Sequence, residues 1–167
     1  LSVAQGCVPH YHVFKCAILF TFYGFLKMAD LTSSSQSDFD PARNICRGDI
    51  FRSHPGLVVL LKRLNRHQLG KKGDHKLVPL SQLQDQVLCP VTAYNEMEAI
   101  IPTVYANQPL LSLPSPPGEK ICTVNPDWLD KMLAKSLKRM GEDPRCFSFD
   151  SLRRAGATMA YKRGVEY

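Results

Sequence analysis

The longest apolar stretch of the chain runs from residue 11 to residue 31 (YHVFKCAILFTFYGFLKMADL) and predicts a helix. Its nonpolar side chains fall on nearly every face, which indicates a helix buried in the middle of a helical domain rather than an amphipathic surface helix. Gly24 has no side chain, so we expect a neighbouring element to pack closely there. The apolar part between Lys15 and Lys27 is too short to span a bilayer.

A small antiparallel sheet is predicted next along the chain. Residues 45 to 51 (ICRGDIF) can form a short strand, and residues 54 to 56 (HPG) form a turn. The run GLVVLLKRL, from residue 56, has the composition of a strand, and residues 75 to 80 (HKLVPL) are its expected partner. The segment 62 to 76 is then a β-hairpin whose tip is basic.

Further helices are predicted from their capping residues. Pro90 heads one helix, which places Tyr94, Met97 and Ile101 on one face. Asn125 is the expected N-cap of the next.

The helix after Asn125 ends where Gly141 supplies a stop signal. Its apolar stripe consists of Leu129, Leu133, Leu137 and Met140. We expect the lysines beside this stripe, and Arg139, to form an ordinary solvated face. The last helix begins near Ser148 or Asp150. The whole pattern predicts one domain that is mainly α with a small antiparallel sheet, in the α+β class.

Charge adds a candidate partner to this picture. The chain of 167 residues has 21 Lys and Arg against 15 Asp and Glu, a net charge of +6, which suits a polyanion such as double-stranded DNA. Its six cysteines contain no C-x-x-C pair, so we expect reduced thiols of an intracellular protein and no metal site. No motif for a cofactor is present, and we expect none.

The basic hairpin has two interpretations. It can be a loop kept soluble by its charges, or it can reach a DNA phosphate backbone. Under the second interpretation, the residues that face DNA are Lys62, Arg63, Arg66, His67, Lys71 and Lys72.

The segment 147 to 160 (FSFDSLRRAGATMA) places Arg153 and Arg154 side by side in front of a run of small residues. Earlier in the chain stand GFLK at the end of the long apolar run, RGD before the sheet, VPL at the end of the hairpin and LCPVTA at a helix start. This ordered set resembles the catalytic domain of tyrosine recombinases, in particular the DIRS-type and Crypton-type enzymes of eukaryotic mobile elements. Those enzymes cut and rejoin DNA through a phosphotyrosine intermediate.

The resemblance implies roles for three positions. Arg153 would be the second arginine of the family, which grips the phosphate that is cleaved. Lys27 stands where the family has its first arginine, and Asp150 stands where it has a histidine. Lys27 cannot form the bidentate contact of an arginine, whereas Asp150 is an anion that can cap the helix or pair with Arg153 or Arg154. Arg154 would face a backbone phosphate or a carboxylate.

The remaining catalytic positions are less well matched. Lys62, Lys71 and Lys72 all remain candidates for the hairpin lysine. The nucleophilic tyrosine of the family lies well beyond the second arginine, whereas Tyr161 falls on the arginine helix and Tyr167 comes too early. We therefore expect residues 1 to 167 to form a partial recombinase domain that lacks the tyrosine-bearing helix.

Three functions remain open for such a chain. The first is a DNA-binding domain of the recombination and integration class, nuclear, assembled as a homo-oligomer on DNA and unable to cleave it. The second is a non-enzymatic DNA-binding domain domesticated from a mobile element. The third is a decayed product without function, in which the apolar helix 13 to 31 is poorly covered.

Overall fold

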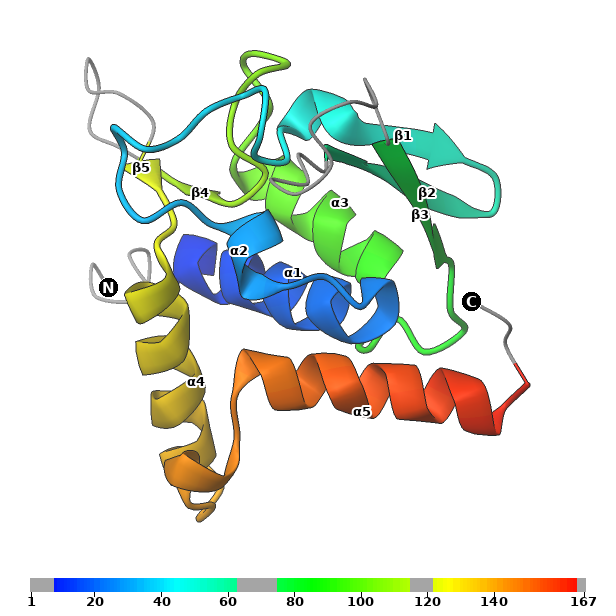
Figure 1. Cartoon of the computed structure of the whole chain (residues 1–167), viewed down its shortest axis with the longest axis vertical. Helices are drawn as coiled ribbons and strands as arrows, with labels where there is room; N and C mark the ends of the chain where they lie inside the picture. Colours follow the sequence, from blue (N-terminus) through cyan, green and yellow to red (C-terminus); the bar gives the residue numbers. More distant parts are fainter. Residues whose placement is uncertain (1–7, 63–74, 115–121, 165–167) are drawn as a thin grey trace, which may run out of the picture.

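The computed structural model describes residues 8 to 62, 75 to 114 and 122 to 164, and it has an α+β fold (Figure 1). The helices and strands in chain order are α1 (Val8–Gly24), α2 (Met28–Leu31), β1 (Ile50–Ser53), β2 (Gly56–Lys62), β3 (His75–Ser81), α3 (Pro90–Ile100), β4 (Ser112–Leu113), β5 (Cys122–Thr123), α4 (Pro126–Arg139) and α5 (Phe149–Lys162). Single 3-10 turns cover Arg47–Asp49 and Pro144–Cys146.

Helix α1 is the centre of the fold. It packs against α3, α5 and β3, and Val13, Cys16, Ala17 and Phe20 on it are fully buried. In Figure 1, α5 (orange) lies along one side of α1 (blue) and α3 (green) along another. The expectation that helix 13 to 31 is poorly covered is therefore wrong, because these elements supply the apolar contacts that α1 needs.

The predicted helix 11 to 31 is interrupted. Helix α1 ends at Gly24, Phe25 adopts a φ of 52°, and the short α2 begins after Lys27. A Cβ added at Gly24 would lie 3.2 Å from Leu26 Cγ and 3.3 Å from Leu80 Cδ2, so the expected close packing at this glycine is confirmed.

The three-stranded sheet has the order β1-β2-β3, with all strands antiparallel. Val59 on β2 pairs with Ile50 on β1 and with Val78 on β3, which confirms the predicted pairing of the two long strands. The residues that face the helices, Leu57, Val59 and Leu61 on β2 with Val78 and Leu80 on β3, are buried.

The strand predicted for residues 45 to 51 begins only at Ile50. Residues 47 to 49 form a 3-10 turn instead, because the backbone amides of Arg47 and Gly48 donate to the carbonyl oxygens of Gln108 and Ala106, both at 2.8 Å. These bonds tie the turn to the loop after α3.

The predicted helix starts and stops agree with the structure. The Asn125 side chain accepts a hydrogen bond from the Trp128 amide at 2.8 Å, and Gly141 adopts a φ of 80° after α4. The apolar stripe of α4 is buried at Leu129, Leu133 and Leu137. The prediction that Met140 belongs to this stripe is wrong. Met140 is 67% exposed, because this C-cap residue lies past the last turn that packs on the rest of the fold.

Helices α1 and α5 run in the same direction and cross closely. The ring of Phe149, at the start of α5, lies 6.5 Å from that of Phe14. Further along both helices, a Cβ added at Gly156 would overlap the carbonyl oxygen of Phe22 and lie 2.9 Å from its carbonyl carbon. The run of small residues in α5 thus allows a helix contact that a larger side chain at position 156 would prevent.

Gly156→Ala should lower the free energy of unfolding by about 1 to 3 kcal/mol, because the added methyl group overlaps the α1 backbone. In an unobstructed helix the same substitution would stabilise by about 1 kcal/mol, so the sign of the change is diagnostic. Urea unfolding followed by circular dichroism measures it. Ala155→Leu, on the exposed side of the same turn, is the control and should change stability by less than about 0.5 kcal/mol. Stabilisation by Gly156→Ala would contradict the close crossing.

Candidate nucleic-acid interface

An open pocket of about 480 Å³ lies where the first turn of α5 meets the loop between α1 and α2. It is lined by Lys27, Met28, Asp130, Ser148, Phe149, Asp150 and Arg153. The fold therefore brings Lys27, Asp150 and Arg153 together from opposite ends of the chain. These are the three positions that the recombinase resemblance singles out.

Two local features position these side chains. The chain turns at Phe25 and starts α2, where the Lys27 amide donates to Asp30 Oδ2 at 2.9 Å. On the other side, Phe149 is 1% exposed and anchors the start of α5 in the core beside α1. Both sides of the pocket are thus fixed relative to α1.

Asp150 binds both arginines of α5. Its Oδ1 accepts hydrogen bonds from Arg153 Nε at 3.1 Å and from Arg153 Nη2 at 2.7 Å, while its Oδ2 forms an ion pair with Arg154 Nε at 3.2 Å. The Arg153 hydrogen bond holds the pKa of Asp150 below its usual range, and the charges of Arg153, Arg154 and Lys27 act in the same direction. At neutral pH, Asp150 is therefore an anion among three cations.

Ser148, rather than Asp150, caps α5. The Ser148 side chain accepts from the Ser151 amide at 3.1 Å, and Ser151 Oγ accepts from the Ser148 amide at 2.7 Å. Of the two roles that the sequence left open for Asp150, the structure shows ion pairing.

The charged side chains that line the pocket are two cations, Lys27 and Arg153, and two carboxylates, Asp130 and Asp150. Lys27 carries a point charge and cannot form the bidentate contact of an arginine. Tyr161 is 77% exposed and lies eight residues beyond Arg153, about 12 Å further along α5. Its hydroxyl is not among the groups that line the pocket.

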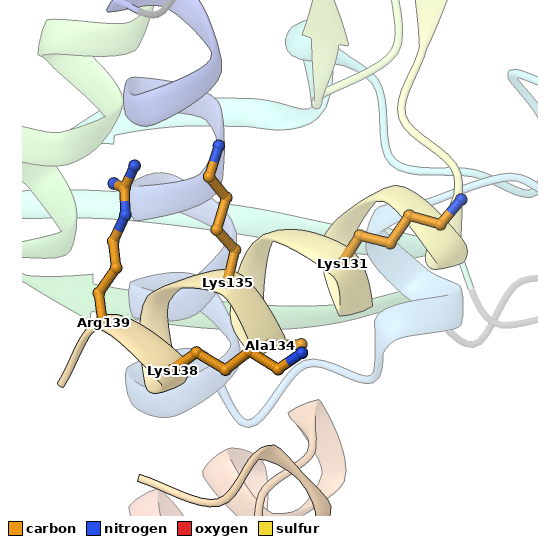
Figure 2. A pocket seen from close by; sticks show the side chains of 5 residues that line it. All are labelled: Lys131, Ala134, Lys135, Lys138 and Arg139. Carbon is orange, nitrogen blue, oxygen red and sulfur yellow. The ribbon is translucent and has the colours of Figure 1, made fainter. Parts of the chain in front are cut away.

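A second pocket, of about 500 Å³, lies on α4 (Figure 2). It is lined by Lys131, Ala134, Lys135, Lys138 and Arg139. In Figure 2 the side chains of Lys135 and Arg139 extend in the same direction from consecutive turns. None of the ion pairs found in the described part of the chain involves the four cations of this α4 basic face.

The four cations were expected from the sequence to form an ordinary solvated face, and they are exposed, but their grouping around one pocket was not predicted. The signal available in the sequence was their spacing. Counted from Lys131, the other three cations follow after four, seven and eight positions: Lys135, Lys138 and Arg139. Positions with this spacing share one side of a helix.

Most of the hairpin residues predicted to face DNA cannot be assigned to the candidate interface. Among its predicted DNA-facing residues, Arg63, Arg66, His67, Lys71 and Lys72 lie outside the described residues. Lys62 is described, and its side chain is 18% exposed. Its ammonium group forms an ion pair with Asp49 Oδ2 at 2.6 Å and donates to the Pro41 carbonyl oxygen at 2.8 Å. Lys62 is thus engaged within the fold, and we leave it out of the candidate interface.

Other site chemistries find no support among the described residues. They contain no group of His, Cys, Asp and Glu that could hold a metal ion, and none of their helices has the length and apolarity needed to cross a membrane. The five described cysteines are free: Cys16, Cys46 and Cys89 are buried, whereas Cys122 and Cys146 are exposed. Burial raises the pKa of Cys16 to about 12, so its thiol remains protonated at neutral pH.

The chain matches no protein-family model, no curated protein and no solved structure. Its function must therefore be inferred from the residues and surfaces described above.

Lys62→Met should lower the free energy of unfolding by about 3 kcal/mol, because it leaves the Asp49 carboxylate, only 10% exposed, without its counter-charge. Urea unfolding measures the change. Lys76→Met is the control: Lys76 is an exposed lysine on the paired strand β3, and its replacement should change stability by less than about 0.5 kcal/mol. Equal, small effects of the two substitutions would show that Lys62 is not held by Asp49.

Proposed function

We propose that this chain is a DNA-binding domain similar to the catalytic domain of tyrosine recombinases, which binds the phosphate backbone of double-stranded DNA without cleaving it. The observation that carries the proposal is the meeting of Lys27 and Arg153 in one open pocket. These residues are distant in sequence, and the recombinase resemblance assigns both to the phosphate that is cleaved.

The electrostatics of the surface support a polyanionic ligand. Backbone amides at a helix N-terminus favour anions, and Arg153 adds a guanidinium group one turn into α5. Helix α4 contributes Asp130 to this pocket and also carries the α4 basic face. The cations among these groups are of the kind that contact DNA phosphates without reading the base sequence, while Asp130 and Asp150 offset part of their charge in the pocket.

The substitutions at the two motif positions favour binding without catalysis. A lysine can bind a phosphate as a point charge, so Lys27 supports affinity more than transition-state stabilisation. Asp150 places a carboxylate beside the phosphate position, where negative charge would increase during cleavage. The same resemblance implies a nuclear protein that assembles as a homo-oligomer on DNA, and we include both in the proposal.

The proposal is tested by fluorescence anisotropy with a labelled DNA duplex over a series of salt concentrations. We expect the logarithm of the association constant to fall linearly with the logarithm of the salt concentration. Lys135→Ala combined with Arg139→Ala should reduce the magnitude of that slope by roughly two, because two phosphate contacts are lost.

The matched control is Arg43→Ala combined with Arg52→Ala, which removes the same charge from two residues outside both pockets. Arg43 pairs with Asp40 Oδ2 at 3.3 Å. Arg52 already donates to Asn95 Oδ1 at 2.9 Å and pairs with Glu98 Oε2 at 3.3 Å, so its replacement should leave the slope unchanged. Absence of binding by the folded protein, or equal effects of the two double variants, would contradict the proposed interface.

A further inference from the structure

The Asp150 carboxylate is shared between two arginines and has no other described role. It contacts Arg153 with one oxygen and Arg154 with the other. Because Ser148 caps the helix, Asp150 is not needed to start α5. Its side chain is 56% exposed, so its ion pairs lie at the protein surface where a ligand can compete for the arginines.

We propose that Asp150 is a positioning residue that holds Arg153 and Arg154 in an internal ion-pair cluster and thereby weakens their contacts with DNA phosphates. This inference rests on the proposed function, since it concerns the strength of DNA binding at the same pocket. Asp150 thus acts as an autoinhibitory contact within the interface.

The geometry at Arg153 explains the competition. Asp150 Oδ1 accepts from Nε and Nη2 of Arg153, which together form one hydrogen-bonding edge of the guanidinium group. That edge is also suited to grip a phosphate with two parallel hydrogen bonds, and it can serve only one such partner at a time. DNA must therefore displace Asp150 from this edge or bind Arg153 by its remaining donors.

The charge of Asp150 acts in addition to its hydrogen bonds. The Asp150 carboxylate lines the pocket together with that of Asp130, where it repels an incoming phosphate and offsets the attraction of the surrounding cations, Lys27 among them. Exposed ion pairs are weak, so a phosphate backbone can still displace this one. Asp150 is expected to reduce the DNA affinity and not to abolish it.

A second exposed aspartate provides a matched control. Asp143 pairs with Arg145 Nη2 at 2.8 Å, and both residues lie outside the two pockets. Its side chain also accepts from the Arg145 amide at 3.0 Å, a contact that an asparagine oxygen can replace. Asp143→Asn and Asp150→Asn both raise the net charge by one, so they differ only in which arginines they release.

The experiment is the same duplex titration with the two variants. Asp150→Asn should bind DNA about 3 to 10 times more tightly, with a salt slope steeper by roughly one, because an arginine becomes available to a phosphate. Asp143→Asn should change the affinity less than about twofold. Asp150→Glu keeps the charge within reach of both arginines and should restore the affinity of the unmodified chain.

A double-mutant cycle identifies the arginine that responds. In an Arg153→Ala background, the gain from Asp150→Asn should fall to less than about half of its value. A full gain in that background would overturn the assignment to Arg153. Asp150→Ser should give the same gain as Asp150→Asn and serves as the second variant if the asparagine protein folds poorly.

The outcomes separate this inference from the proposed function. If the unmodified chain binds DNA and Asp150→Asn binds no more tightly than Asp143→Asn, the positioning role is overturned while DNA binding stands. If neither the unmodified chain nor Asp150→Asn binds the duplex, both are overturned. A salt slope that becomes steeper for Asp150→Asn but not for Asp143→Asn supports both the DNA-binding function and the positioning role of Asp150.

Discussion

The close crossing of α1 and α5 positions the charged residues of the pocket at the start of α5. Phe149 anchors the start of α5 beside Phe14, and the missing side chain at Gly156 lets the helix approach the Phe22 backbone. Because α5 is held at both places, its first two turns face the loop that carries Lys27. A buried apolar contact thus creates the polar pocket, and a change that separates the two helices would disperse it.

Two sets of cations among the described residues differ in their ion-pair partners. Some stabilise the fold: Lys15 pairs with Glu96 at 2.8 Å between α1 and α3, and Lys62, at the end of β2, pairs with Asp49 in the 3-10 turn before β1. The α4 basic face has no acidic partner among the described residues, and the α5 arginines share the single carboxylate of Asp150. Both the α4 basic face and the α5 arginines line one of the two pockets or lie beside it, where an external anion can reach them.

The sequence predicted most elements because their signals are local. Helix caps, the composition of the two long strands and the apolar run of α1 each depend on neighbouring residues. What it could not predict depends on contacts between distant segments. The ion pair of Lys62 requires the position of Asp49, the exposure of Met140 requires knowing where α4 leaves the core, and the choice between capping and pairing for Asp150 required the Ser148 cap. The class of the fold is confirmed, whereas the recombinase resemblance stays a prediction.

The central proposal is that DNA contacts both the pocket at Lys27 and the start of α5, and the α4 basic face. Its most direct test is to titrate the isotope-labelled protein with a short duplex and follow every backbone amide signal by nuclear magnetic resonance. We predict the largest changes at residues 27 and 28, residues 148 to 154 and the α4 basic face, with β1 and α3 unaffected. Changes confined to the sheet, or none at saturating DNA, would contradict the account.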